Sequence, residues 1–457
     1  MTIEVIILAA GKGTRMRSTL PKVLHPLAGK PLLNHVLDTA NCLSPNRIHV
    51  VYGYGGDTVP NTIGNNSINW VFQEQQQGTG HAVRLAIPHV DDDAVVLVMY
   101  GDIPLISSVT MAELIATATR SQTLAVLTMQ TDDAGAYGRI IRDSEGNVTG
   151  IVEAKDATRE QLAIGEFNTG FMAAPAKLMN GWLQGLSNKN AQGEYYLTDI
   201  VAAAVAEGRN VVTTSAENAY EVEGVNSKQE LAALERLHQI ENAHRLMDHG
   251  VCFADPNRFD LRGTLDAGED CYFDINLIIE GNNRFGQGVS IGPNCVIKNA
   301  VIGDNVTIHA NSVVEDAEIH DHCNVGPFAR IRPGTVLKQG ARIGNFVETK
   351  NAQIGPGSKA NHLAYVGDAE VGSNSNIGAG VITCNYDGAN KHKTTIGDDV
   401  FVGSDSQLIA PVTIEDGATI GAGTTLSSTA PSNQLTVGRA KARTIRNWVR
   451  PTKGGNH

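Results

Sequence analysis

The sequence predicts an α/β domain with a mainly parallel sheet, then a linking helix, then a parallel β-helix. Up to about residue 228, short β-rich runs alternate with helical stretches, the pattern of strands joined by helices. A segment without Gly or Pro follows, and beyond residue 250 aliphatic residues recur every six positions. At 457 residues the chain is about three times as long as a typical domain, so several domains are expected.

The first domain, residues 1–228, is expected to hold buried strands separated by helices. None of its apolar runs approaches the ~20 residues that a membrane span needs, so no membrane span is expected. The expected strands are Glu4–Leu8, Ile48–Val51, Val95–Tyr100 and Leu124–Thr128, and two expected helices are Ala82–Ala86 and Thr110–Ala118.

Residues 229–249 are predicted to form one linking helix. Apolar side chains recur in this segment at near-helical spacing, and nothing interrupts the pattern. They are Leu231, Leu234, Leu237, Ile240 and Ala243.

The region 250–457 contains a repeat of six residues. Positions 396, 402, 408, 414, 420 and 426 are Ile, Val, Leu, Ile, Ile and Leu. A helix has a period of 3.6 and an exposed strand a period of 2, so a period of six favours short strands joined by turns, with one aliphatic side chain per rung inside. The alternative is an ordinary Gly-rich β domain, but its aliphatic residues would not keep a six-residue spacing over so many repeats. Between Thr383 and Ile396 the phase slips, which predicts a projecting loop suited to binding.

Composition narrows the function classes. A net charge of -12 argues against a general nucleic-acid binder, which needs a basic surface. The six cysteines form no C-x-x-C pair, and no basic segment precedes an apolar run at the N-terminus. A cytoplasmic protein is therefore expected.

The first strand leads into a candidate phosphate-binding turn. Gly11 and Gly13 follow the strand, and the cations of Arg15 and Lys22 lie just beyond. The turn lacks the Lys-Ser/Thr of a Walker A loop and the third Gly of a dinucleotide fingerprint. Asp102 ends another strand and could supply an oxygen ligand to Mg²⁺, although an isolated Asp there could also cap a turn.

Polar residues gather at one stretch of the repeat. Arg332 and Lys350 are one 18-residue coil apart, so their cations should stack in a way that suits a phosphate. His362 could act as general base toward an amine, although a single His is more often structural. Tyr365 and Asn376 complete this predicted cluster.

Together these motifs resemble a known enzyme family. LAAGKGTRM, QQGTGHA and YGD, with Asn168-Thr169-Gly170 and Glu223–Asn226, are similar to motifs of sugar-1-phosphate nucleotidylyltransferases. RIRPG, FVETK, KANHLAYVGD, NIGAG and TCNYDG resemble the acetyltransferase half of the bacterial bifunctional N-acetylglucosamine-1-phosphate uridylyltransferase/glucosamine-1-phosphate N-acetyltransferases. The resemblance extends to about Arg439. It implies a Rossmann-like nucleotidyltransferase domain at 1–228, a linker helix at 229–249, and a left-handed hexapeptide β-helix acetyltransferase domain with a C-terminal tail at 250–457.

For the first domain the resemblance implies transfer of UMP from UTP to N-acetylglucosamine-1-phosphate, with release of pyrophosphate. Asp102 and Asn226 would share Mg²⁺, and Lys22 would contact phosphate. The implied UTP and sugar-nucleotide residues are Leu8, Ala9, Ala10, Gly11, Arg15, Lys22, Gln73, Gly78, Thr79, Tyr100, Gly101, Asp102, Gly138, Glu153, Asn168 and Asn226.

For the second domain it implies transfer of acetyl from acetyl-CoA to glucosamine-1-phosphate in a homotrimer, with sites between subunits. His362 would take the proton from the amine. Arg332, Lys350, Tyr365 and Asn376 would bind the sugar phosphate, and the implied acetyl-CoA residues are Ala379, Asn385, Tyr386, Ser404, Ala422 and Arg439.

Two other functions remain open at the level of sequence. The chain could be a nucleotidylyltransferase whose solenoid only regulates or oligomerises, but His362 and the stacked cations disfavour this. It could also be a regulatory protein that has lost catalysis, which the intact Lys22, Asp102 and Asn226 disfavour.

Overall fold

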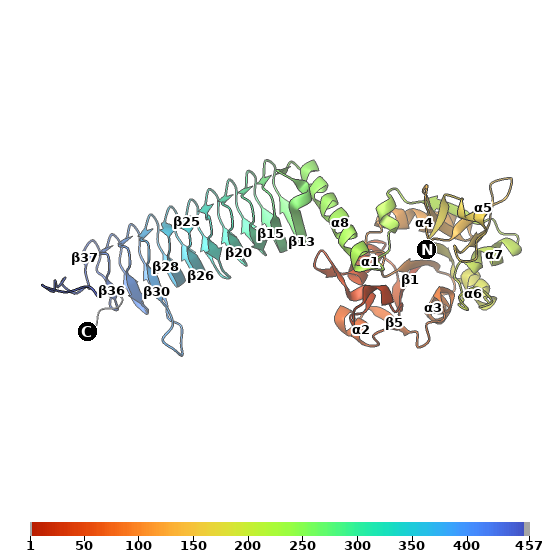
Figure 1. The fold of residues 1–457 in the computed structure, drawn as a ribbon, viewed down its shortest axis with the longest axis horizontal. Coiled ribbons are helices and arrows are strands. Elements are labelled where there is room, and N and C mark those ends of the chain that lie inside the picture. Colours follow the sequence, from red (N-terminus) through yellow and green to blue (C-terminus); the bar gives the residue numbers. More distant parts are fainter. Residues whose placement is uncertain (1, 452–457) are drawn as a thin grey trace. The chain divides into compact units, whose positions relative to one another are not determined.

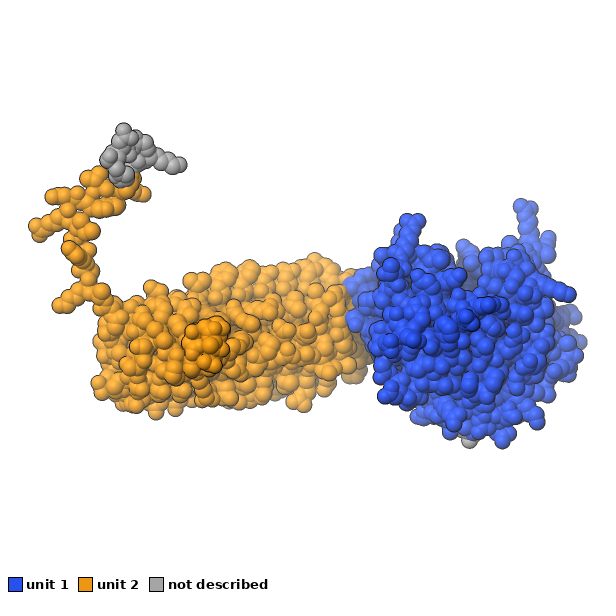
Figure 2. Space-filling view, turned by 90° about the horizontal axis from the view of Figure 1, so that it is seen from below, with its two compact units in different colours: residues 1–238 blue, residues 239–457 orange. Residues whose placement is uncertain are grey.

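The computed structural model describes residues 2–451. The chain divides into two compact units, residues 1–238 and 239–457 (Figure 2). Residues 452–457, the end of the predicted C-terminal tail, lie outside the described part. No helix within residues 2–451 is both long and apolar enough to cross a membrane.

The first unit is built on a nine-stranded sheet whose central strands are parallel (Figure 1). β1 (Ile3–Ala9) pairs in parallel with β4 (Arg47–Tyr52) on one side and with β6 (Val95–Tyr100) on the other. β10 (Glu166–Pro175) runs antiparallel between β6 and β7 (Ala125–Gln130), so the sheet is mainly but not wholly parallel. The predicted strands are all present, with bounds within two residues of those expected.

The remaining strands of this unit complete the sheet or pair beside it. β5 (Ile68–Phe72), β8 (Arg139–Arg142), β9 (Val148–Val152) and β11 (Val212–Ser215) belong to the nine-stranded sheet, and β2 (Pro26–Leu27) and β3 (Lys30–Pro31) form a separate two-stranded sheet. The helices are α1 (Leu32–Cys42), α2 (Thr58–Ile63), α3 (Thr79–Ala86), α4 (Ser108–Ser121), α5 (Arg159–Leu162), α6 (Ala176–Gln184) and α7 (Asp199–Ala206). Two apolar cores flank the sheet, one on each face.

Helix α8 (Lys228–Asp248) occupies the segment in which the sequence predicts a linking helix. In its first half, Leu234 belongs to a small core with Leu27 and Leu32. In its second half, Ala243 and Leu246 join the core of the solenoid. The boundary between the two units falls within this helix, between residues 238 and 239.

The side chain of Gln239 ties the second half of α8 to the first coil of the solenoid. Its amide is fully buried. It donates to the Leu261 carbonyl at 3.0 Å and accepts from the Leu261 amide at 2.7 Å. One side chain thus satisfies both backbone groups of a strand residue that would otherwise lie at an open edge.

The second unit is a parallel solenoid with three faces. An 11-stranded parallel sheet forms face 1, and a 15-stranded sheet forms faces 2 and 3 because its long strands bend at the corner between them. Face 1 consists of β12 (Cys252–Phe253), β14 (Tyr272–Phe273), β16 (Ser290–Ile291), β19 (Thr307–Ile308), β22 (Asn324–Val325), β25 (Arg342–Asn345), β27 (Lys359–His362), β29 (Asn376–Ile377), β32 (Phe401–Val402), β35 (Thr419–Ile420) and β37 (Leu435–Thr436).

Faces 2 and 3 share the long strands β13 (Phe259–Ala267), β15 (Leu277–Phe285), β26 (Glu348–Ile354) and β28 (Tyr365–Val371). Face 2 adds β17 (Val296–Lys298), β20 (Val313–Glu315), β23 (Arg330–Ile331), β30 (Ile382–Cys384), β33 (Gln407–Ile409) and β36 (Thr425–Leu426). Face 3 adds β18 (Val301–Ile302), β21 (Glu318–Ile319), β24 (Val336–Leu337), β31 (Thr394–Ile396) and β34 (Val412–Ile414).

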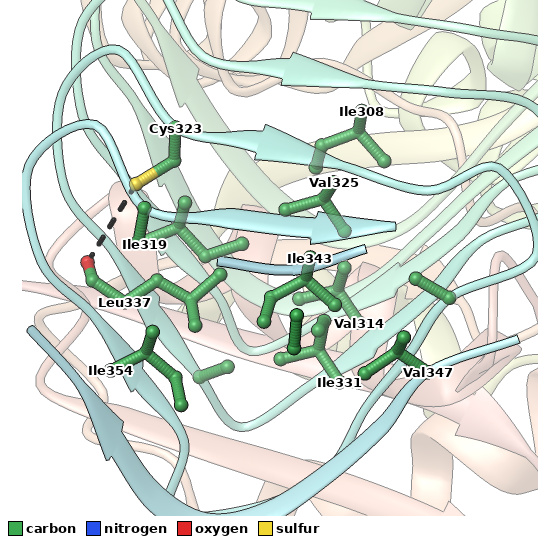
Figure 3. Close-up of a cluster of buried hydrophobic side chains, with 14 of the residues drawn as sticks. Ile308, Val314, Ile319, Cys323, Val325, Ile331, Leu337, Ile343, Val347 and Ile354 are labelled. Carbon is green, nitrogen blue, oxygen red and sulfur yellow. Dashed lines mark hydrogen bonds between the residues drawn. The ribbon is translucent and has the colours of Figure 1, made fainter. Parts of the chain in front are cut away.

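The six-residue period corresponds to one inward side chain per strand. Figure 3 shows aliphatic side chains from the three faces meeting inside the solenoid, among them Ile343, Ile331 and Leu337, each with no exposed surface. The six aliphatic positions from 396 to 426 are likewise buried. The predicted hexapeptide solenoid is therefore confirmed. The phase slip is a hairpin between β30 and β31 that projects from the stack (Figure 1), with an antiparallel bridge between Tyr386 and Lys391.

Candidate active sites

A cavity of about 570 Å³ opens at the carboxyl ends of β1 and β6, the edge where open α/β sheets bind ligands. The turn after β1 forms one wall, and the loop before α3 forms the opposite wall. The lining residues that the sequence predicts are Leu8, Ala9, Ala10, Gly11, Lys22, Gln73, Gly78, Thr79, Tyr100 and Asp102. Gln76 and Glu194 also line it and were not predicted, whereas the exposed Arg15 is not among the lining residues.

Lys22, Asp102 and Asn226 meet at this cavity although they are far apart in sequence. The Lys22 ammonium forms an ion pair with the Asp102 carboxylate and donates to Asn226 Oδ1 at 3.1 Å. Both charged side chains are largely buried. Two oxygen atoms therefore converge on one cation. Among residues 2–451, no group of three or more His, Cys, Asp or Glu side chains could hold a metal ion.

The predicted sugar-binding residues form a second group. The backbone N–H of Asn168 donates to the Gly138 carbonyl at 2.8 Å, and Glu153 accepts a hydrogen bond from the Thr198 hydroxyl at 3.0 Å. A Cβ atom at Gly138 would lie 2.9 Å from the Ile151 side chain, which is too close, and 3.5 Å from the Glu153 carboxylate, which is ordinary contact. Burial raises the pKa of Glu153, and the charges of Asp199 and Asp156 raise it further.

Tyr100 connects the two groups. A Cβ atom at Gly170 would lie 2.7 Å from the Tyr100 ring, so only glycine, which has no side chain, fits at this position. Burial, and then the negative charges of Glu153 and Asp102, raise the pKa of Tyr100 well above its ordinary value. The phenol is therefore neutral and available as a hydrogen-bond donor.

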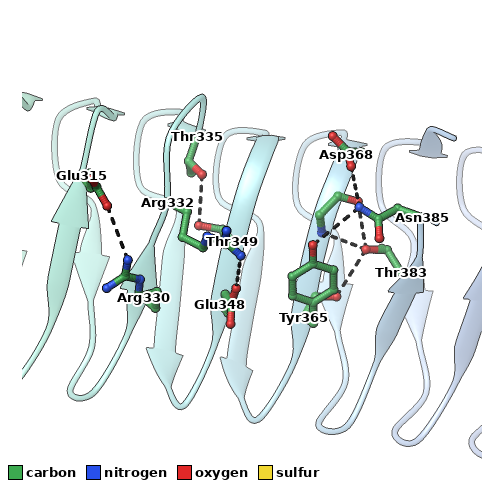
Figure 4. A network of polar contacts seen from close by, with 11 residues as sticks. Glu315, Arg330, Arg332, Thr335, Glu348, Thr349, Tyr365, Asp368, Thr383 and Asn385 are labelled. Carbon is green, nitrogen blue, oxygen red and sulfur yellow. Dashed lines mark hydrogen bonds and ion pairs between the residues drawn. The ribbon is translucent and has the colours of Figure 1, made fainter. Parts of the chain in front are cut away.

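On the solenoid, face 2 carries a polar row (Figure 4). The pairing of β23 with β26 places Arg332 and Lys350 at the same position of successive coils, as the sequence predicts. The Arg332 guanidinium donates to Glu348 at 2.6 Å, so its charge is already matched. Glu348 was not predicted. Tyr365 lies one coil beyond Glu348 on the same face.

Lys350 faces a second cation across a cavity of about 650 Å³. Lys391, on the projecting hairpin, lines the same cavity, and its hydrogen bond and charge lower the pKa of Lys350. Two ammonium groups that line one cavity repel each other and favour an anion between them. Lys391 was missed because the insertion interrupts the repeat that drew attention to the other residues.

His362 and Asn376 lie on face 1, away from the row on face 2. His362 Nδ1 is 2.9 Å from Asn345 Oδ1, and Asn376 follows on the next coil. Within one chain, the five residues that the sequence groups together therefore lie on two different faces. The chain turns a corner between His362 and Tyr365, so three residues of separation place their side chains on different faces.

The candidate acetyl-CoA residues are also divided. Ala379, Ser404 and Ala422 fall at one corner of successive coils, and Arg439 donates to the Ala422 carbonyl. Asn385 and Tyr386 lie instead on the hairpin between faces 2 and 3. Asn385 contacts the Asp368 carboxylate, while the Tyr386 hydroxyl donates to the Gly388 carbonyl at 2.6 Å.

Comparison with known proteins matches both units. Residues 5–162 match the MobA-like NTP transferase domain, residues 267–356 the GMPPB C-terminal domain, and residues 393–428 six bacterial transferase hexapeptide repeats. The bifunctional protein GlmU of Nitrosospira multiformis is 54% identical over 452 residues, covering 99% of this chain and 98% of that protein. A crystal structure of UDP-glucose pyrophosphorylase complexed with UDP-glucose covers 52% of this chain and 98% of its own, with a TM-score of 0.43 and 17% identity. At that TM-score the likeness supports no inference.

The fold and these matches define a transferase that joins a nucleotidyltransferase domain to a hexapeptide-repeat acyltransferase domain. The Nitrosospira protein is more than 50% identical to this chain over nearly its whole length, so the match includes both domains. The chain belongs to the bifunctional GlmU family.

Proposed function

We propose that residues 1–228 carry uridylyl transfer, that 229–249 form the linker, and that 250–457 carry acetyl transfer. The chain acetylates glucosamine-1-phosphate with acetyl-CoA and transfers UMP from UTP to N-acetylglucosamine-1-phosphate, releasing pyrophosphate. The observation that carries the assignment is the convergence of Lys22, Asp102 and Asn226 at the cavity beside the β1 turn. All six cysteines are free, which supports a reducing cytoplasm.

In the uridylyl site, positioning and charge neutralisation supply the catalysis. The turn Leu8–Gly11 and Lys22 hold the phosphates, Gln73 with Gly78 and Thr79 reads uracil, and Tyr100 to Asp102 with Glu153 bind the sugar nucleotide. The convergence of Asp102 and Asn226 oxygens on a cation fits Mg²⁺, a hard ion that prefers oxygen ligands. When bound, Mg²⁺ would neutralise charge that develops on the transferring phosphoryl group.

In the acetyl site, His362 takes a proton from the glucosamine amine as the amine nitrogen attacks the acetyl carbonyl. The thioester C–S bond then breaks, and coenzyme A leaves as the thiol with the proton that His362 returns. The hydrogen bond between His362 Nδ1 and Asn345 orients the ring and leaves Nε2 for the amine. The cations Arg332 and Lys350 hold the sugar phosphate, and Lys391 assists them from the hairpin. Ala379, Ser404, Ala422 and Arg439 would hold acetyl-CoA along one corner.

We propose a homotrimer with acetyl sites between subunits. The division of His362 and Asn376 from Arg332, Lys350 and Tyr365 supports it, because a neighbouring subunit could bring face 1 of one chain against face 2 of another. Exposed apolar side chains at the corner between faces 1 and 2 also support the trimer. Three bulky apolar residues there, Phe328, Phe346 and Leu363, are at least half exposed and have positive φ, a conformation that such side chains disfavour.

Substitutions at the two sites test the assignment. Asp102→Ala should abolish uridylyl transfer and leave acetyl transfer unchanged, because Asp102 lies in the first unit. Each product is followed separately with glucosamine-1-phosphate, acetyl-CoA, UTP and Mg²⁺. His362→Ala is the matched control, with the opposite pattern. Loss of both activities in a folded Asp102→Ala protein would refute the two-site assignment.

A further inference from the structure

The segment Tyr195–Thr198, just before α7, contacts both ends of the uridylyl site. Neither the motifs nor the cavity lining draws attention to it, since these four residues are absent from both. Tyr196, Leu197 and Thr198 are buried, so the segment forms part of the wall behind the ligand site and is fixed by its neighbours.

At the uracil end, the segment is paired with the loop before α3. The Tyr195 amide donates to the Gln77 carbonyl at 2.8 Å, and the Gly80 amide donates to the Tyr195 carbonyl at 2.8 Å. The Leu197 amide donates to Thr79 Oγ1 at 3.1 Å. A Cβ atom at Gly78 would lie 2.6 Å from the Tyr195 carbonyl oxygen, so the two backbones are too close to move independently.

At the sugar end, the segment holds Glu153. The Thr198 hydroxyl donates to Glu153 Oε1 at 3.0 Å. Thr198 precedes the first residue of α7, where a Thr hydroxyl commonly accepts a hydrogen bond from the helix backbone, yet it makes no such bond here. Its hydroxyl donates to the Glu153 carboxylate instead. The half-buried Glu153 gains from this bond, because partial burial without a donor is costly for a carboxylate.

We propose that Thr198 is a positioning residue for Glu153, and that Tyr195–Thr198 couples uridine recognition to sugar recognition. The proposal rests on the proposed uridylyl site. A nucleotide that orders the loop Gln77–Gly80 also fixes Tyr195 and Leu197, and through the adjacent Thr198 it fixes the carboxylate that faces the sugar. Glu153 is then oriented before the sugar phosphate arrives, so the entropy cost of ordering its side chain does not fall on the binding of the sugar.

Binding of UDP and of UDP-N-acetylglucosamine separates this role from general destabilisation. Thr198→Val removes the hydroxyl but keeps the shape, and should weaken UDP-N-acetylglucosamine binding by about tenfold to a hundredfold while UDP binding changes less than about threefold. Thr198→Ser should restore most of the loss. Thr39→Val is the matched control: Thr39 lies in α1, its hydroxyl donates to the Ile106 carbonyl, and its loss should change neither affinity.

Two further measurements test the coupling. In a Glu153→Ala background, Thr198→Val should cost far less than in wild type, because position 153 then has no side-chain oxygen to accept the Thr198 hydrogen bond. Amide hydrogen exchange of residues 194–199 should slow when UDP alone binds. Equal losses for UDP and UDP-N-acetylglucosamine, or exchange unchanged by UDP, would overturn the proposal. A wild-type protein that binds neither nucleotide would refute the uridylyl site itself.

Discussion

The exposed corner of the solenoid allows the proposed trimer to be tested without weakening the subunit. At this corner, Asn311 has a φ of 62° and Phe346, two coils further, a φ of 56°. Asn adopts this left-handed conformation more readily than Phe, because its short polar side chain can bond locally. Phe346→Asn should therefore leave the fold of each subunit at least as stable as before.

The cost to the trimer can be worked out from the exposed surface. Phe346 is 57% exposed, and a Phe side chain offers about 150–250 Å², so roughly 100 Å² is left to be covered by another subunit. At about 25 cal/mol per Å² this contributes about 2.5 kcal/mol per copy. Three copies contribute about 7.5 kcal/mol, or about five orders of magnitude in the trimer dissociation constant. Phe328 stacks on Phe346 with ring centroids 5.4 Å apart and should share the effect.

Sedimentation over a range of concentrations measures the assembly, and the two activities are measured on the same samples. Phe346→Asn should dissociate at concentrations where wild type stays trimeric, and it should lose acetyl transfer in step while retaining uridylyl transfer. Val109→Asn is the control, because it also replaces an exposed apolar residue with Asn but lies on α4 of the first unit. A Phe346→Asn protein that stays fully trimeric, or a dissociated one that keeps full acetyl activity, would refute the reasoning.

Three more predictions concern single side chains. His362→Ala should lower acetyl turnover about 10²–10⁴-fold, the usual range for a positioned base, with little change in KM; a loss below threefold in steady-state assays would leave the residue a structural role. Lys391→Ala should raise the KM for glucosamine-1-phosphate about tenfold and return the pKa of Lys350 toward its ordinary value, which titration by NMR would follow. Glu153 has a raised pKa when folded, so the folded state binds its proton more tightly and wild-type stability falls as pH rises from the ordinary carboxyl pKa through the raised one. Glu153→Gln should remove this fall, giving a higher Tm than wild type at pH 8 and a similar Tm near pH 4, and melting curves with no pH-dependent difference would contradict it.

The solenoid could be predicted from sequence because its core repeats. Each coil meets only its neighbours, so an inward aliphatic at every sixth position satisfies packing without reference to distant segments. The same regularity predicts that Arg332 lies beside Lys350, since one coil separates them. It does not predict the partner of Arg332, because Glu348 points outward, where the repeat imposes no residue type.

The parts that escaped prediction depend on corners, insertions and long-range contacts. His362 and Tyr365 are close in sequence, yet a corner of the chain turns them to different faces. Lys391 lies in the hairpin, outside the repeat. Lys22 meets Asn226 across 204 residues, a contact that periodicity cannot indicate. The resemblance to a family placed both residues in the uridylyl site but did not give this contact.

The hydrogen bonds between Gln239 and Leu261 bear on how the solenoid avoids polymerising. A stack of parallel coils ends in a strand whose amides and carbonyls could pair with another stack, and an uncovered end would invite fibres. By placing a helix and one side-chain amide on that end, the chain closes the stack at its first coil. Coils could then be added or lost further along during evolution, changing the length of the protein without exposing a new edge at this end.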